Sequence, residues 1–368
     1  MSSKKNKFSV RLLERGFENP LILPAVELIP AQYTWNTMGG PHSADIDVKT
    51  TSKDSRSIWE LLEWLRCPIE IFDHNQTCVW WGYVSEIEIS VGALTVGVTM
   101  DSMSNKVATL FETDTKQKAT TTWNQDDGSV STYGTKELLL TSTTIGQDAA
   151  EFLRDEFLNF YKKPIPNMSI EGAKGELSAR LNCRGWWSTL SWKYYSAIAG
   201  AAVPTTTQIA NIISACGQFI TGTQINNVSG ISVDPFRQGD NDGLFEAESL
   251  LEIGSSSGKR LISTVTRERE VIIAEEPALD PYKIGIYILE DGSLKNLWGD
   301  ASYASMCPVG AWAQLKDVIP GSLDFGLLAD PTIFFIEEAT YDIANERYIP
   351  VPRGQNSPFG IGTKISEG

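Results

Sequence analysis

The residue types that most often carry catalysis or metal binding are sparse in this sequence. Its 368 residues include only two histidines, His42 and His74, and both look like turn residues. Neither stands in HExxH or HxH spacing, and no GxSxG nucleophile motif occurs. A general base or a metal ligand needs partners at a suitable spacing. We therefore expect neither histidine to be catalytic or metal-binding.

Two segments imitate known binding loops. Residues 254–260 (GSSSGKR) are one residue too short between the glycines for a P-loop, and Arg260 stands where Ser or Thr would hold magnesium. We interpret them as a turn after a helix that ends at Gly254. Residues 240–243 (DNDG) miss the twelve-residue calcium pattern, and an Asx-rich turn before a helix fits them better. The sequence thus predicts no catalytic residue, no cofactor and no metal, and we interpret the chain as not an enzyme.

The composition is that of an acidic, aromatic-rich globular chain. The formal net charge is −15, and the chain has 11 tryptophans. Such a charge repels a phosphate backbone, so sequence-wide nucleic-acid binding is disfavoured. The basic N-terminus, with Lys4, Lys5 and Lys7, is the exception, and we interpret it as a solvated tail. An excess of Trp and Tyr usually serves cores and protein interfaces.

Cysteine usage and hydropathy predict where the chain is made. Its five cysteines are widely spaced and never form CxxC, so we expect reduced, mostly buried thiols and synthesis in a cytoplasm. No apolar stretch of about twenty residues occurs, so no membrane-spanning segment is expected. The N-terminus has no apolar signal core, so export by a signal peptide is not expected.

Hydrophobic periodicity predicts a mainly β chain with α+β insertions. Alternating residues predict strands at 22–35, 44–49, 69–72, 77–89, 94–100, 177–183, 219–231, 261–266, 271–274, 284–289, 294–297, 311–318, 333–341 and 347–351. Apolar faces at helical spacing predict helices at 58–66, 147–161, 207–216 and 244–253. We divide the chain into an N-terminal extension (1–20), a first β-barrel domain (21–112), a linker (113–132), a mixed α/β insertion domain (133–205), a second barrel-like α/β domain (206–300) and a C-terminal β segment and tail (301–368).

Several motifs are more specific than composition. Residues 33–41 (YTWNTMGGP) open the first sheet, residues 58–71 (IWELLEWLRCPIEI) hold a helix that ends in Arg-x-Pro, and residues 78–87 (CVWWGYVSEI) read W-x-G-x-V. Residues 101–108 (DSMSNKVA), 133–137 (YGTKE) and 183–192 (CRGWWSTLSW) follow in order. Over about residues 20–320, this succession resembles the hub proteins of tailed bacteriophages, the baseplate-hub or tail-tip subunits that close the tail tube.

The resemblance implies an architecture, a location and partners. It implies two tail-tube-like β-barrel domains with helical or mixed insertions. It also implies a homotrimer forming a pseudo-sixfold ring at the virion tail tip, a structural conduit for DNA ejection. Partners in the family are the distal tail protein or last tail-tube ring, the tape-measure protein, and central spike or tail-fibre proteins. DNA would pass without sequence-specific binding. Some relatives carry peptidase or lysozyme-like domains, but this short chain shows no such extension, so lytic activity is not carried over.

Six aromatic residues are candidates for the interfaces of such a ring: Trp80, Trp81, Tyr83, Trp186, Trp187 and Trp192. Trp80 and Trp81 are adjacent on a predicted strand and so point to opposite faces. For all six, a role in the core of the chain is an equal alternative.

Two other functions stay open. A tail-associated cell-wall hydrolase would need a polar cleft with an isolated carboxylate or a His/Cys pair. A receptor- or carbohydrate-binding tail module would need exposed tryptophans on a flat strand face.

Overall fold

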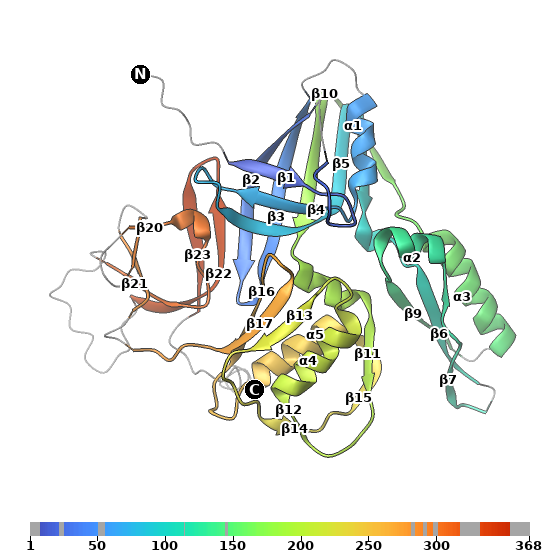
Figure 1. The fold of residues 1–368 in the computed structure, drawn as a ribbon. Helices are drawn as coiled ribbons and strands as arrows, with labels where there is room; N and C mark the ends of the chain where they lie inside the picture. The colour runs from blue at the N-terminus through green and yellow to red at the C-terminus, as the bar shows by residue number, and fades with distance from the viewer. Residues whose placement is uncertain are drawn as a thin grey trace.

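The computed structural model describes residues 8–21, 26–50, 56–113, 115–143, 146–280, 284–289, 293–296, 301–316 and 332–353. Strands dominate these residues, and most of them join one large sheet (Figure 1). The basic N-terminus, residues 291–292 between two predicted strands and the tail after residue 353 lie outside the described residues.

The centre of the large sheet comes from the first half of the chain. Its strands are β1 (Ser9–Leu12), β2 (Val26–Asn36), β3 (Met38–Thr50), β4 (Pro68–Phe72), β5 (Cys78–Thr99) and β10 (Asn167–Arg184). They run in the order β1-β4-β5-β10-β3-β2. In β3, Ala44, Ile46 and Val48 are buried while Asp45 and Asp47 are partly exposed, which is the alternation that the sequence predicted.

One short helical segment covers this sheet. It consists of α1 (Arg56–Trp59) and the 3-10 helix η1 (Glu60–Trp64). Ile58, Leu61 and Leu65 are at most 1% exposed, so the predicted apolar face is confirmed. The chain enters β4 at Pro68, because proline lacks the N–H that a continuing helix would need.

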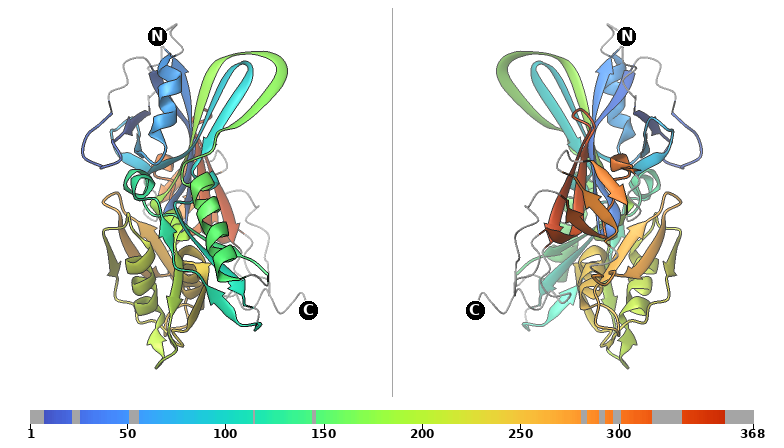
Figure 2. Two further views of the ribbon diagram at one scale, coloured as in Figure 1. Left: turned by 90° about the vertical axis from the view of Figure 1, so that its right-hand side faces the viewer. Right: turned by 90° about the vertical axis from the view of Figure 1, so that its left-hand side faces the viewer.

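Strands β5 and β10 bend back together as a two-stranded ribbon (Figure 2). The hydroxyls of Ser90 and Thr95 lie 2.9 Å apart across this fold in β5. Gly92, at the bend, has φ +63°, a backbone conformation that glycine adopts without steric cost. Val96 and Val98 on the returning half are buried.

A smaller sheet follows the 3-10 helix η2 (Met100–Ser102). It contains β6 (Lys106–Glu112), β7 (Lys118–Thr120), β8 (Asn124–Gln125) and β9 (Glu137–Thr141). Helix α2 (Asp127–Tyr133) lies between β8 and β9 in the chain, and helix α3 (Gln147–Tyr161) packs on β6. The predicted bounds of α3 are those of the structure.

A helical pair forms the lower part of the molecule in Figure 1. Helices α4 (Thr205–Cys216) and α5 (Gly243–Ile253) pack together. On one side lie β13 (Gly222–Ile225), β16 (Leu261–Val265) and β17 (Glu270–Glu275), and on the other lie β11 (Tyr194–Ala197) and β15 (Arg237–Asp242) (Figure 1). Strands β12 (Val203–Pro204) and β14 (Ser232–Val233) pair beside them, and the 3-10 helix η3 (Trp186–Trp192) leads in from β10.

The C-terminal strands return to the large sheet. They are β18 (Ile286–Ile288), β19 (Leu294–Asn296), β20 (Ala301–Ser302), β21 (Trp312–Leu315), β22 (Ile333–Asp342) and β23 (Arg347–Arg353), with the 3-10 helix η4 (Ala304–Met306) after β20. β22 pairs with β2 across about three hundred residues of sequence, so the start and the end of the described chain share one sheet.

The predicted fold class, mainly β with α+β insertions, is confirmed. The described part of the chain contains no pairing that joins β1 to β20, so its large sheet is not a closed barrel. The turn interpreted at residues 254–260 is confirmed, but residues 240–242, interpreted as part of an Asx-rich turn, are instead the end of strand β15, which runs directly into α5. Gly254 caps the end of α5 with φ +90°, and Asp242 caps its start by accepting a hydrogen bond from the Phe245 N–H.

Strands that the sequence analysis assigned to different segments pair with one another in the structure. β1 belongs to the sheet although it lies in the predicted extension. The predicted linker 113–132 contains β7, β8 and most of α2. Strands of three and two residues, with few apolar side chains, give little hydrophobic signal. β10 pairs with β5 and β3 although it lies in the predicted insertion. β18 pairs with β21 across the predicted boundary at residue 300.

Three other predictions can be compared with the structure. All five cysteines are free, and all but Cys78 are buried, as expected. His74 lies in the turn between β4 and β5, but His42 is an exposed residue of β3, since the strand continues through Pro41 instead of starting after it. Among the described residues, no helix is long and apolar enough to cross a membrane.

Candidate interaction site

Three of the six motifs that carry the family resemblance meet at one junction. Gly39, Gly82 and Gly185 come from three of them, and each approaches another motif too closely for a side chain. A Cβ on Gly39 would lie 2.3 Å from Cγ of Trp187, and one on Gly82 would lie 2.1 Å from the Arg184 carbonyl oxygen. A Cβ on Gly185 would lie 1.7 Å from the Pro41 carbonyl oxygen. All three distances are shorter than a real contact allows, so the three motifs fix one another's positions.

Next to this junction an aromatic cluster fills the core. The ring centroids of Tyr83 and Trp186 are 5.1 Å apart, and those of Tyr83 and Trp192 are 5.7 Å apart in an edge-on arrangement. Phe219 contacts both tryptophans. Such pairs stabilise by about 0.5–1.5 kcal/mol each beyond burial, so the cluster ties β5 and η3 to the end of α4.

The six aromatic candidates divide into two groups. Trp80, Tyr83, Trp186, Trp187 and Trp192 are at most 4% exposed, so their side chains contact this chain, as the core alternative describes. Trp81 is partly exposed and points to the opposite face from Trp80. Its indole Nε1 donates to the Val265 carbonyl at 3.0 Å. Trp81 and Trp186 line one cavity together.

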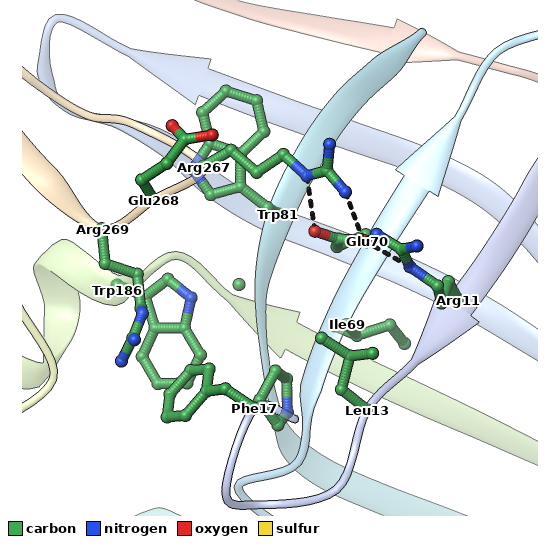
Figure 3. A pocket seen from close by; sticks show the side chains of 12 residues that line it. Arg11, Leu13, Phe17, Ile69, Glu70, Trp81, Trp186, Arg267, Glu268 and Arg269 are labelled. Carbon is green, nitrogen blue, oxygen red and sulfur yellow. Dashed lines mark hydrogen bonds and ion pairs between the residues drawn. The ribbon is translucent and has the colours of Figure 1, made fainter. Parts of the chain in front are cut away.

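That cavity, of about 330 Å³, lies between β1, β4, β5 and the turn that joins β16 to β17 (Figure 3). Its charged lining is formed by Arg11, Glu70, Arg267, Glu268 and Arg269. The Glu70 carboxylate holds two arginines. Nε of Arg11 donates to it at 2.7 Å, and Nε and Nη2 of Arg267 donate at 2.7 Å and 3.2 Å. The hydrogen bonds that Arg267 donates to the Glu70 carboxylate raise the pKa of the Arg267 guanidinium.

The opposite wall combines arginine with aromatic rings. The Arg269 guanidinium lies 3.6 Å from the Phe17 ring centroid, and its Nη1 donates to the Phe219 carbonyl at 3.2 Å. Arg66 lies behind Phe17, and burial, with Arg15 and Arg269 nearby, lowers its pKa to about 10. Its buried Nε has no hydrogen-bond partner among the described residues. Guanidinium groups beside aromatic rings favour carboxylates and planar groups, so this wall of the cavity has the chemistry to bind a carboxylate.

This cavity could hardly be predicted from the sequence. Arg267 and Arg269 alternate with two glutamates at a turn between predicted strands, and a charge cluster at a hairpin is a weak signal of binding. Arg11 and Phe17 lie in a segment predicted to be an extension, yet β1 brings Arg11 to Glu70.

The described residues also bear on the open alternatives. They contain no group of three or more His, Cys, Asp or Glu side chains placed to hold a metal ion. Among their strongly exposed large hydrophobic residues Trp123 is the sole tryptophan, so they present no flat face of exposed tryptophans.

No protein-family model and no curated protein matches the chain. Solved structures do match it along most of their length. The 43 kDa tail protein of prophage MuSo2 from Shewanella oneidensis is 8% identical, with 95% of this chain and 97% of that one covered and a TM-score of 0.42. Prophage tail protein gp18 from Listeria monocytogenes EGD-e is 9% identical, with 98% of each chain covered and a TM-score of 0.40.

A third match is the E. coli c3393 protein, described as a type VI secretion component with structural similarity to T4 tail proteins gp27 and gp5. It is 9% identical, with 94% of this chain and 77% of that one covered and a TM-score of 0.42. The first two are described as prophage tail proteins, and the third as similar to phage tail proteins. Identities of 8–9% with TM-scores near 0.4 are too low to transfer a function to this chain.

Proposed function

We propose that this chain is a structural subunit of a bacteriophage tail tip, a baseplate-hub protein that acts by assembly. One observation carries the proposal: three of the motifs that resemble hub proteins, residues 33–41, 78–87 and 183–192, meet at the junction of Gly39, Gly82 and Gly185. Trp186 and Trp187 of the same motifs are buried there. These three motifs therefore form one structural unit.

In this proposal three copies form a ring that closes the tail tube and joins it to the tip. Ring closure needs surfaces on each copy that match the next copy. The neighbours would be the distal tail protein or last tube ring, the tape-measure protein, and spike or fibre proteins. The cavity lined by Arg267 and Arg269 is a place where an acidic side chain of such a neighbour would bind.

The net charge of −15 suits a conduit. DNA repelled by an acidic wall would slide past it without sequence-specific binding. No enzymatic step is needed for this role.

Negative-stain electron microscopy of the purified full chain tests the proposal. Class averages should show rings of three copies around a central hole. Single compact particles at every concentration imaged would contradict it. A cleared zone on purified cell walls would instead favour the hydrolase, and glycan binding by the isolated chain would favour the receptor-binding module.

A further inference from the structure

Three neighbouring arginines at and behind the Phe17 side of the cavity pair with no carboxylate of the described residues. They are Arg15, Arg66 and Arg269. The acceptors of their hydrogen bonds are backbone carbonyl groups. The chain has 46 acidic and 31 basic residues, and on the opposite side of the cavity Glu70 alone holds two arginines. The Phe17 side therefore keeps a positive charge that the described part of the chain does not neutralise.

Arg66 is the most buried of the three, at 5% exposure. Its Nη1 and Nη2 donate to the carbonyls of Arg15 and Thr132 at 2.9 Å and 3.2 Å. Its buried Nε has no partner among the described residues. Burying a charge without a counter-ion costs free energy, so the arrangement would gain from an anion bound beside it.

Three residues on this side of the cavity occupy backbone conformations that favour glycine. Phe17, Arg66 and Arg269 have φ of +70°, +65° and +67°. Arg66 follows Leu65, which has φ −52° and ψ 135°, so it is the third residue of a type II turn, where Gly or Asn normally stands. A side chain in this conformation costs free energy that glycine would not. Such strain concentrates where the side chain serves a site.

The strained residues bring their side chains together. The Arg269 guanidinium lies 3.6 Å from the Phe17 ring centroid, and the Arg66 guanidinium lies 5.9 Å from it. The Trp186 ring centroid is 5.1 Å from that of Phe17, and Phe17, Trp186 and Arg269 all line the cavity (Figure 3). Nη1 of Arg269 donates to the Phe219 carbonyl.

The other edge of the Arg269 guanidinium is available. Its Nε and Nη2 have no acceptor among the described residues, since the one hydrogen bond of this side chain comes from Nη1. Two adjacent N–H groups in one plane match the two oxygens of a carboxylate. A single carboxylate would therefore complete the hydrogen bonding of Arg269.

The charge of the cavity selects between anions. Three arginines and two glutamates line it, a formal charge of +1. A carboxylate, with one negative charge, brings this sum to zero. A phosphate group carries about −1.5 to −2 at pH 7 and would leave negative charge beside the two glutamates. The lining therefore favours a carboxylate over a phosphate.

We propose that this cavity binds the carboxylate of an aspartate or glutamate side chain of a partner protein, with Arg269 as the binding group. Arg267 is already held by a glutamate of this chain, whereas Arg269 offers its Nε and Nη2. The apolar stem of the acidic side chain would pack on Phe17 and Trp186, which line the same space. The partner protein as the source of the carboxylate rests on the proposed assembly role, but the carboxylate site itself does not.

NMR titration of the isotope-labelled full chain tests the site through the Nε–H signal of Arg269 and the indole N–H signal of Trp186. The probe is the peptide acetyl-Gly-Glu-Gly-amide, and the control peptide has glutamine in place of glutamate. The glutamate peptide should shift both signals until they saturate. Its apparent Kd should be lower than that of the glutamine peptide by about tenfold or more, because only the carboxylate forms charge-assisted hydrogen bonds.

Variants of the chain locate the binding group. Arg269→Gly removes the guanidinium, and glycine suits φ +67°, so this variant should fold. The Trp186 signal should then report an apparent Kd for the glutamate peptide about tenfold or more above that of the wild type. Arg180→Gln is the matched control, since Arg180 pairs with Asp47 outside the cavity, and it should bind like the wild type.

The titration outcomes separate this site from the proposed ring. Equal Kd values for the two peptides, or for Arg269→Gly and the wild type, would overturn the site and leave the ring standing. Inorganic phosphate or acetate bound as tightly as the glutamate peptide would overturn the assignment to an acidic side chain. Saturable binding by a chain that stays at the mass of one copy would support the site while contradicting the ring.

Discussion

Replacing Gly39 by alanine tests the junction that carries the proposed function. Gly39 has φ +96°, and an added Cβ would lie 2.3 Å from Trp187 Cγ. Trp187 is 4% exposed, and its Nε1 donates to Glu248 at 3.2 Å, so the ring cannot move away freely. The left-handed conformation costs a residue with a side chain about 1–2 kcal/mol, and overpacking costs about 1–3 kcal/mol.

The expected loss is the sum of these two effects, about 2–5 kcal/mol in the free energy of unfolding. An unfolding entropy of about 2.1 cal/mol/K per residue gives roughly 0.8 kcal/mol/K for a chain of 368 residues. The Gly39→Ala variant should therefore melt about 3–6 °C below the wild type, as measured by thermal unfolding with circular dichroism.

Two other glycines serve as matched controls. Gly92 also has a positive φ, +63°, but nothing lies within 4 Å of an added Cβ, so Gly92→Ala isolates the backbone effect. It should lower Tm by about 1–3 °C. Gly97 has neither a positive φ nor a close neighbour, and Gly97→Ala should not lower Tm. Equal losses for Gly39→Ala and Gly92→Ala would refute the close packing of Trp187 on Gly39.

Three further predictions concern buried groups and a helix cap. Burial raises the pKa of Glu248, so the native chain binds the proton of this carboxyl group more tightly than the unfolded chain and gains stability as pH falls through the folded pKa. Glu248→Gln should therefore raise Tm at pH 7, where the wild-type carboxyl group is ionised. The gain in Tm should vanish at pH 4, where that group is protonated. Burial raises the pKa of Cys183 and Cys307. A thiol reagent at pH 8 should therefore leave both cysteines unmodified in the folded chain and modify all five cysteines in urea. Fast modification of Cys183 before unfolding would contradict its buried position. Asp126 accepts the Ser129 N–H at 2.8 Å at the start of α2, so Asp126→Ala should cost about 0.5–2 kcal/mol in urea unfolding, with Asp148→Ala on the exposed side of α3 as a control expected to change less.

The elements that could be predicted from sequence are those with a strong local pattern. Helix α3 keeps its predicted bounds because its apolar residues recur at helical spacing and Lys162 and Lys163 follow it. Helix α5 could be predicted because Asp242 and Gly254 mark its two ends. In these segments the local preference and the tertiary packing agree.

The elements that could not be predicted depend on distant contacts. Residues 186–192 form a 3-10 helix, because Trp186, Trp187 and Trp192 turn inward to the aromatic cluster. Strands β7 and β8 are only three and two residues long and need β6 beside them. Neither pattern is visible in a local window.

The candidate site shows the same division. The sequence analysis named Trp81 and Trp186 as interface candidates, and both line the cavity. The sequence could not show that Arg11 and Arg267, about 250 residues apart, would share the carboxylate of Glu70. That contact depends on β1 pairing with β4, and β1 is too short to be predicted.

The mass of the purified full chain in solution tests the central claim most directly. One copy has a mass of 40.5 kDa. A ring-forming hub subunit should give a single species with the mass of three copies, and this species should keep its mass on dilution into the low micromolar range. A single species at 40.5 kDa, unchanged up to the highest soluble concentration, would contradict the account.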